Sequence, residues 1–545
     1  MPSPAIMVLI KLSALVACLS LLAEYLVFAN DRLIVDTGYA KYRGNLSYPD
    51  TVAYLGIPYA EPPIDDRRFR APIPLNTTRI ALEADGAIFD ATSYPDFCVQ
   101  GSTLAGDAGG AGSEDCLKVN IYSPTNGSNL PVLVYIHGGN YVYGNPATFP
   151  FDHWVHQSPN VVIVTIYYRL SSFGFLAIPE FSDTDNGDFN VGFLDQRQAL
   201  KWVKRHIRAF GGDASRVTIN GQSSGGASVE LHLVVHEDES LFSGAIIQSA
   251  YRTPLPSPEQ QRPLFDFYAE RAGCGSGSLS SKLQCLREAS VSTLAHAQDA
   301  AANGEFAGLY NAFHPVIDGK TLTEFPTLSL GLGHFTRVPL IVGSDSNESY
   351  IPGHDIPSSL KILFPGLDEQ DMSDYLIAYP SSDFESEEQR LATATGESLN
   401  RCCRPILAGA YSSKGINTWA YRYNQPNPTS NNPTIVGHGA ENWMMFLGSN
   451  TGYNGSATFS SLTPEETAFS QELIAYWLSF VRAQDPNTFR LQRSPVWDRF
   501  SVGDKRQIVL QQNTTTMSGS FIELTDEKEV ARCEFVASKV KKEQN

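Results

Sequence analysis

The segment GQSSG at residues 221–225 places a serine between closely spaced glycines. The pattern G-x-S-x-G is typical of a nucleophile elbow, a sharp turn from a strand into a helix that strains the central serine and exposes its hydroxyl. Small residues flank the serine because a Cβ there would collide with the neighbouring strand or helix. The register assigns the nucleophile position to Ser223. It also places Ser224 where its backbone N–H starts the helix and can point at an oxyanion.

A serine hydroxyl needs a general base, and the base needs an acid that fixes its tautomer. In chains with this elbow, the acid and then the histidine follow the serine. The downstream histidines are His232, His236, His296, His314, His334, His354 and His438. His438 lies in the glycine-rich loop IVGHGAENW, whereas His232 and His236 fall on the elbow's own helix and are expected to be ordinary helix residues. For the acid, LIVGSDSNESY offers Asp345 and Glu348, and the residue types alone do not choose between them.

An oxyanion hole requires backbone N–H groups that no side chain obstructs. The segment YIHGGNYVYG follows the apolar run PVLVY and contains Gly138, Gly139 and Asn140. Such a segment can be an ordinary tight turn. Its position at the end of a strand, before the elbow, favours an oxyanion hole.

Alternating apolar runs and amphipathic segments predict the elements that position these residues. Strand-like runs at 131–139 and 161–170 precede a helical segment at 193–210, and the strand RVTIN then leads into the elbow. This β, β, α, β order with continuous apolar strands predicts an α/β fold, in which helices cover both faces of a mainly parallel sheet. Internal repeats are lacking, so one large domain over residues 30–545 is expected.

Composition and the N-terminal segment indicate the class of protein and its compartment. The 545 residues are 42% hydrophobic, as in a globular protein, and the formal charge of −18 disfavours nucleic acid and anionic membranes as partners. Lys11 precedes the apolar run 12–23, and Val27-Phe28-Ala29 resembles a cleavage site, so residues 1–29 are expected to be a secretory signal peptide. An uncleaved signal anchor is the alternative, but Glu24 disfavours a stable span. We therefore expect a secreted protein without a stable membrane anchor.

Sequons and cysteines are consistent with an extracellular route. N-x-S/T triplets begin at Asn45, Asn76, Asn126, Asn347, Asn454 and Asn513. Local spacing favours disulfides between Cys98 and Cys116 and between Cys274 and Cys285, and one of Cys402 or Cys403 could pair with Cys533 and leave a free thiol. Because the cysteines and histidines lack zinc-site spacing, no metal is expected.

Several ordered motifs resemble the type-B carboxylesterase and lipase family of the α/β-hydrolase fold, which includes cholinesterases and fungal lipases. They are GIPYAEPP with RFRAP, SEDCLKVNIYSP, the segment 190–226 and VWDRF, and they span about residues 33 to 500. The resemblance implies Ser223 as nucleophile, Glu348 as acid and His438 as base, with no cofactor. It implies oxyanion donors at the N–H groups of Gly139, Asn140 and Ser224. Asn347 would then lie in a buried setting beside the acid and escape glycosylation.

The chain departs from the family pattern near the nucleophile. Gln222 and Ser224 replace the usual glutamate and alanine, Asn140 replaces the third glycine of HGGG, and Tyr167 stands where asparagine is usual. Asparagine tolerates positive φ better than other non-glycine residues, so the oxyanion hole can persist.

The resemblance narrows the expected function to a secreted serine carboxylesterase that acts on small-molecule esters through an acyl-enzyme. The loop between Cys98 and Cys116 has no tryptophan, so choline esters are not expected as preferred substrates. Its sizeable apolar residues are only Val99 and Leu104, which disfavours a lipase lid. The alternatives are a triacylglycerol lipase and, since neuroligin-like relatives generally lack a triad member, less favourably a non-catalytic adhesion protein. Nothing in the sequence indicates the oligomeric state.

Overall fold

The computed structural model describes residues 33–100, 112–235, 239–304, 306, 312–451 and 456–545. The predicted signal peptide at 1–29, as well as Leu104, His236 and the Asn454 sequon, lie outside these residues. Within the described ranges, no helix is both long enough and apolar enough to cross a membrane.

Eleven strands pair into one central sheet. In sheet order they are β16 (Phe521–Leu524), β15 (Arg506–Leu510), β12 (Thr418–Tyr423), β11 (Leu340–Asp345), β10 (Gly244–Gln248), β9 (Gly212–Gln222), β7 (Leu130–Ile136), β8 (Val162–Ile166), β6 (Lys118–Pro124), β4 (Thr51–Pro58) and β3 (Asn45–Tyr48). The strands from β15 to β8 all pair in parallel, and antiparallel strands form both edges. The predicted mainly parallel sheet is therefore confirmed.

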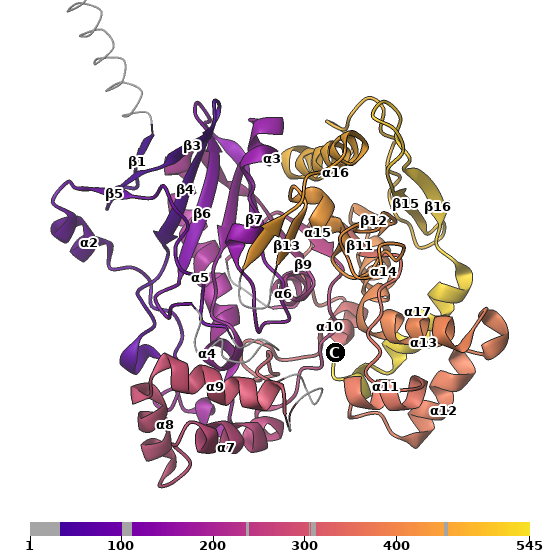
Figure 1. Cartoon of the computed structure of the whole chain (residues 1–545), viewed down its shortest axis with the longest axis horizontal. Coiled ribbons are helices and arrows are strands. Elements are labelled where there is room, and N and C mark those ends of the chain that lie inside the picture. Colours follow the sequence, from indigo (N-terminus) through magenta and orange to yellow (C-terminus); the bar gives the residue numbers. More distant parts are fainter. Residues whose placement is uncertain (1–32, 101–111, 236–238, 305, 307–311, 452–455) are drawn as a thin grey trace, which may run out of the picture.

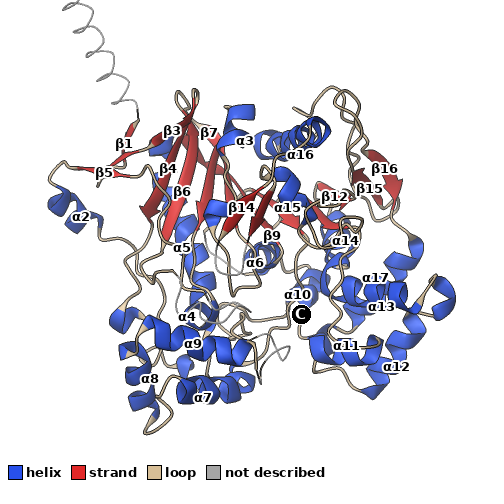
Figure 2. Ribbon diagram, viewed as in Figure 1, coloured by secondary structure: helices blue, strands red, loops and turns tan. Residues whose placement is uncertain are grey.

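Helices cover both faces of this sheet, as predicted (Figure 2). Alternate side chains of β7 enter two different hydrophobic cores, with Val134 in one and Tyr135 in the other. The first core contains residues of α5 (Val191–His206), α6 (Ser224–Val234) and α14 (Cys403–Ser413), and the second contains residues of α3 (Asp152–Gln157), α15 (Ala440–Met445) and α16 (Pro464–Ala483). Because both faces are covered, most side chains of the central strands are apolar, and all residues of β8 and β10 are buried.

Two groups of helices extend from one end of the sheet (Figure 1). At the lower left are α7 (Arg262–Arg271), α8 (Leu279–Glu288) and α9 (Val291–Ala302), and at the lower right are α11 (Ile356–Leu363), α12 (Glu369–Ala378), α13 (Glu387–Gly396) and α17 (Glu527–Ser538). The remaining elements are β1 (Ile34–Asp36), β2 (Lys41–Arg43), β5 (Ile88–Asp90), α2 (Thr77–Ala84), α4 (Ser171–Phe175), α10 (Pro326–Leu332), α18 (Val540–Glu543) and the hairpin of β13 (Ser449–Thr451) and β14 (Ala457–Phe459).

Three disulfides connect the described chain. Cys98–Cys116 and Cys274–Cys285 are the two local pairs that the sequence predicts. The third joins Cys402 to Cys533, 131 residues apart, and Cys403 is a buried free thiol. The tertiary structure thus selects Cys402, because Cys403 belongs to the face of α14 that packs in the first hydrophobic core.

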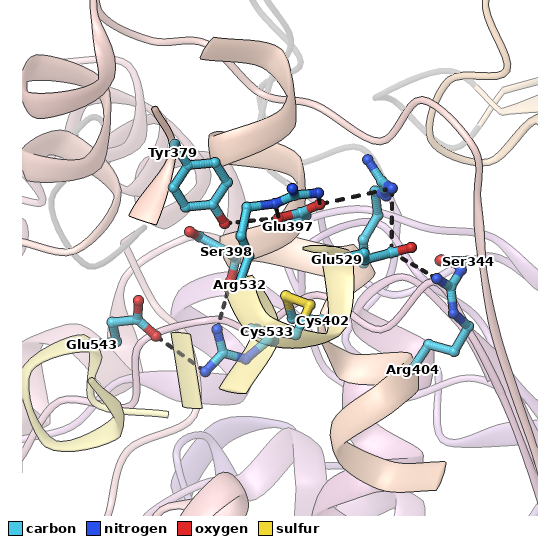
Figure 3. The surroundings of a disulfide bond; sticks show 12 residues. Ser344, Tyr379, Glu397, Ser398, Cys402, Arg404, Glu529, Arg532, Cys533 and Glu543 are labelled. Carbon is cyan, nitrogen blue, oxygen red and sulfur yellow. Dashed lines mark hydrogen bonds and ion pairs between the residues drawn. A yellow bond between two sulfur atoms is a disulfide. The ribbon is translucent and has the colours of Figure 1, made fainter. Parts of the chain in front are cut away.

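Buried ion pairs surround the Cys402–Cys533 disulfide (Figure 3). Glu397 receives two hydrogen bonds from Arg532, and Glu529 receives one from Arg404. Each pair joins α17 to the segment 397–404, as the disulfide also does. Covalent and ionic contacts therefore hold α17 at the same place.

Candidate active site

The turn from β9 into α6 has the geometry expected of a nucleophile elbow. Ser223 adopts φ 60° and ψ −127°, a conformation that is strained for a residue with a Cβ. Its backbone N–H donates to the carbonyl of Gln248 at 2.9 Å, which ties the turn to β10. A Cβ on Gly225 would lie 2.1 Å from the carbonyl oxygen of Ile136 in β7. Close packing of strand and helix thus explains why glycine stands two residues after the serine.

Ser223, His438 and Glu348 lie in a continuous hydrogen-bonded line. The Nε2 atom of His438 is 2.7 Å from Ser223 Oγ, and its Nδ1 atom is 2.7 Å from Glu348 Oε2. The other oxygen of Glu348 accepts from the backbone N–H of Asp345 at 3.2 Å. The carboxylate of Asp345 instead accepts from the N–H of Ala440 at 3.1 Å. Of the two candidate acids, the structure places Glu348 against the imidazole.

The electrostatic surroundings favour protonation of His438. Desolvation acts to lower the pKa of His438, but the charge and hydrogen bond of Glu348 outweigh it and raise the pKa above its ordinary value. The buried carboxyl group of Glu348 therefore stabilises the imidazolium that would form on His438 after proton transfer from Ser223.

Two further buried carboxyl groups lie near this line. Burial raises the pKa of Glu441 to about 7, and Tyr421 donates a hydrogen bond to its Oε2 at 2.8 Å. Burial, and then the neighbouring charges of Glu441 and Glu348, raise the pKa of Asp345 well above its usual range. Sequence reasoning assigned no role to Glu441, although the quoted loop IVGHGAENW contains it three residues after His438. Its burial was not visible from local spacing.

The loop after β7 lies directly against the elbow. A Cβ on Gly138 would lie 2.9 Å from the Cβ of Ser223, so the chain passes close to the nucleophile. Gly139 and Asn140 both have positive φ, 108° and 56°, and their N–H groups donate to no other residue of the described chain. The N–H of Ser224 begins α6, where the first amides have no intrahelical acceptor. Three amides are thus available near Ser223.

Two of the unusual residues make specific contacts. The Oγ atom of Ser224 accepts from the N–H of Tyr141 at 3.3 Å, which connects α6 to the Gly139–Asn140 loop. Gln222 accepts from the side-chain amide of Asn442 at 2.9 Å. A neutral amide pair thus occupies the position beside the nucleophile where the expected family glutamate would place a charge. Nothing in the structure explains Tyr167 in place of asparagine.

A cavity of about 440 Å³ opens at Ser223 and His438. The loop 138–144 forms one part of its wall, and segments within 427–450 form another. Tyr143 and Phe149 contribute aromatic surface. The cavity has the size of a small-molecule site.

His232 lies outside this site. It is buried on α6, its ring packs against Phe193, and its Nε2 lies 3.2 Å from the Gln196 side chain. Burial lowers its pKa to about 3, so the ring is neutral near neutral pH. The expectation of an ordinary helix residue is therefore confirmed for His232.

The predicted burial of Asn347 is wrong. The residue is exposed although it directly precedes the buried Glu348, because it lies in the turn after β11. Its Oδ1 atom accepts from the N–H of Val436 at 3.1 Å.

Comparison with known proteins identifies the family. Residues 31–536 match the sequence model of the carboxylesterase family. The chain belongs to this family. Para-nitrobenzyl esterase of Bacillus subtilis (strain 168) is 30% identical over 88% of this chain and 95% of its own length. Acetylcholinesterase of Bungarus fasciatus is 28% identical over 84% of this chain and 79% of its own length.

A solved structure supports the same carboxylesterase-family assignment. The crystal structure of Aspergillus niger EstA superposes with a TM-score of 0.80 at 29% identity, covering 94% of this chain and 99% of that one. The α/β-hydrolase fold is therefore confirmed. As a member of the carboxylesterase family, the protein is a serine carboxylic ester hydrolase.

Proposed function

We propose that Ser223, His438 and Glu348 form the catalytic triad of this ester hydrolase. The unbroken line of two 2.7 Å contacts carries the proposal. Ser223 Oγ attacks the ester carbonyl while His438 Nε2 removes its proton, and Glu348 holds the imidazole and stabilises its positive charge. The imidazolium then protonates the leaving alcohol. A water molecule that gives its proton to His438 then attacks the acyl-enzyme. The acid is released, and His438 returns a proton to Ser223.

The negative oxygen of each tetrahedral intermediate would be bound by the N–H groups of Gly139, Asn140 and Ser224. The positive φ of Gly139 and Asn140 and the helix-initiating position of Ser224 support these roles. Backbone donors make this hole independent of the side chain at position 140. The asparagine that replaces the usual glycine is therefore compatible with catalysis.

The substrates would be dissolved, uncharged small-molecule esters. The loop between Cys98 and Cys116 contains no tryptophan for a quaternary ammonium group, and the described cavity lining carries several side-chain carboxamides beside its apolar surface. These carboxamides favour a dissolved ester with polar groups over a triacylglycerol. The proposed reaction uses only groups of the protein and water, so it requires no cofactor.

A fluorophosphonate probe tests the assignment, because it reacts covalently only with an activated serine. We expect labelling of the wild-type protein and none of Ser223→Ala. Ser215→Ala is the matched control, since Ser215 is an exposed serine on β9, the strand that leads into the elbow. Labelling that persists in a well-folded Ser223→Ala protein would place the nucleophile elsewhere, and a folded wild-type protein that resists the probe would remove the triad assignment.

We further infer that residues 1–29 are a cleaved signal peptide and that the secreted, glycosylated remainder forms one domain. Strands of a single sheet come from positions as far apart as Asn45 and Leu524, and three disulfides suit an oxidising compartment. Mass spectrometry of the secreted protein, before and after deglycosylation, tests the inference. An intact N-terminus would contradict it.

A further inference from the structure

The cavity at Ser223 is rich in side-chain carboxamides. They belong to Gln222, Asn427, Asn431, Asn432, Asn442 and Asn450. No Asp, Glu, Lys or Arg is among the described residues that line it. A carboxamide donates and accepts hydrogen bonds without carrying charge, which is also the capacity of an alcohol hydroxyl. This lining therefore suits a neutral ligand with several hydroxyl groups.

Most of these carboxamides belong to the same lining segment as His438, the residue that faces the alcohol half of the ester. In the proposed mechanism, on which this inference rests, His438 protonates the leaving alcohol, so that alcohol must lie next to Nε2. His438 and five of the six carboxamides belong to one continuous segment, residues 427–450. The alcohol half consequently meets the amides.

Some of these carboxamides make hydrogen bonds within the protein, and others have donor or acceptor atoms that are free to bind a ligand. Asn427 donates to Asn450 at 3.2 Å and also accepts from Thr429, so these amides stabilise their own loop. Asn432 accepts from Thr434, which leaves its NH₂ group available. The side chain of Asn431 has no hydrogen-bond partner among the described residues and is exposed at the cavity. The outer wall therefore offers donors and an acceptor to a bound molecule.

The side-chain amides of Gln222 and Asn442 form a pair next to the nucleophile, and this pair makes only part of its possible hydrogen bonds. Asn442 donates to Gln222 Oε1, but Gln222 Nε2 and Asn442 Oδ1 are buried without a partner in the described chain. One of these atoms is a donor and the other an acceptor. A hydroxyl that entered beside them would accept from Nε2 and donate to Oδ1. Because these two atoms belong to residues that line the cavity, a ligand hydroxyl could supply the missing partners of both.

We propose that the preferred esters carry a neutral polyhydroxylated alcohol half, of the sugar or polyol class. The carboxamides bind its hydroxyls, while Tyr143 and Phe149 offer apolar surface to its C–H groups. Because the described lining contains no Asp, Glu, Lys or Arg, it offers no fixed charge that would favour a cationic or an anionic alcohol. Recognition of hydroxyls discriminates strongly, because an analogue without them leaves the amides unpaired.

Two acetates with the same acyl group and similar ring size test the proposal: glucose 6-acetate and cyclohexylmethyl acetate. We expect kcat/KM to be at least about tenfold higher for the glucose ester. Equal values, or a preference for the cyclohexyl ester, would overturn the proposal and assign the inner amide atoms to bound water. The activated ester p-nitrophenyl acetate separates the two levels of inference. If it too is left intact, the failure lies in the proposed triad.

Substitutions of the cavity amides test which residues cause the preference for the glucose ester. Asn442→Leu removes the inner pair, and Asn431→Ala removes an exposed loop amide whose loss threatens the fold least. We expect both to reduce the ratio of the two kcat/KM values by about threefold or more, and p-nitrophenyl acetate hydrolysis measures any loss of chemistry that is common to both esters. Asn303→Ala is the control, because Asn303 is an exposed amide that caps α9 and lies outside the cavity lining. A ratio unchanged in both cavity variants would contradict the proposal.

Discussion

At the scale of single residues, the side chains near Ser223 that can carry a proton differ mainly in their burial and partners. They are the imidazole of His438 and the carboxyl groups of Glu348, Asp345 and Glu441. Glu348 contacts the imidazole of His438, whereas Asp345 contacts only backbone N–H groups and has a strongly raised pKa. Asp345 therefore keeps its proton to a higher pH than an ordinary aspartate, and Glu348 is the carboxyl group in contact with the imidazole of His438.

This difference predicts opposite outcomes for two similar substitutions. Glu348→Gln should lower kcat about 10³- to 10⁴-fold, because it keeps the shape but removes the charge that stabilises the imidazolium. Asp345→Asn should change kcat by less than about threefold, because Asp345 does not contact the imidazole and its raised pKa makes a neutral amide a close substitute. Steady-state rates with p-nitrophenyl acetate measure both. Equal losses in the two variants would show that the acid has been misassigned.

The pKa of His438 predicts the acid limb of the pH profile. Only the neutral imidazole accepts the serine proton, so kcat/KM must fall as the pH drops through this pKa. Since Glu348 raises it, the midpoint should lie above the ordinary histidine value of about 6.5. In Glu348→Gln the residual activity should show a midpoint at lower pH. A limb that does not move would mean that another group controls it.

At the scale of elements, the elbow depends on close contact between β7, β9 and α6. Gly225→Ala would place a Cβ 2.1 Å from a backbone oxygen of β7, which cannot move without breaking the sheet. We expect a lower melting temperature and loss of activity. Gly409→Ala on α14 is the matched control, since a Cβ there meets nothing within 4 Å and should stabilise the helix by about 0.5–1 kcal/mol. Identical melting temperatures for the two variants would contradict the steric argument.

At the scale of the whole molecule, the disulfides differ in the length of chain they close. Cys402–Cys533 closes 131 residues and Cys274–Cys285 only 11. Constraint of the unfolded chain predicts about 5 kcal/mol for the long loop and about 3 kcal/mol for the short one. Replacing both cysteines of each pair by serine should therefore lower the melting temperature more for the long loop. The reverse order would indicate that local strain in the folded state dominates.

The ion pairs around this disulfide should increase the fall in melting temperature that follows removal of Cys402–Cys533. Glu397 and Glu529 are buried beside Arg532 and Arg404 on both sides of it, so loosening α17 would leave charges without partners (Figure 3). Sequence spacing placed Cys533 with either of two cysteines, and it carried no sign of these pairs.

The sequence by itself determined the features that depend on neighbours along the chain. The elbow at residues 221–225 follows from steric limits within five residues, the apolar runs specify buried strands, and the two local disulfides close short loops. Each needs only local sterics, periodicity or a short loop. For this reason they could be predicted before any fold was known.

Only the tertiary structure decided which distant groups meet. His438 reaches Ser223 across 215 positions because β9, β10, β11 and β12 lie side by side in the sheet, which brings together the loops that follow them. The same arrangement set Glu348 rather than Asp345 against the imidazole, buried Glu441 nearby, exposed Asn347 and gathered the carboxamides into one cavity. Sequence spacing does not encode these outcomes, because the register of the sheet and the path of each loop fix the direction of a side chain.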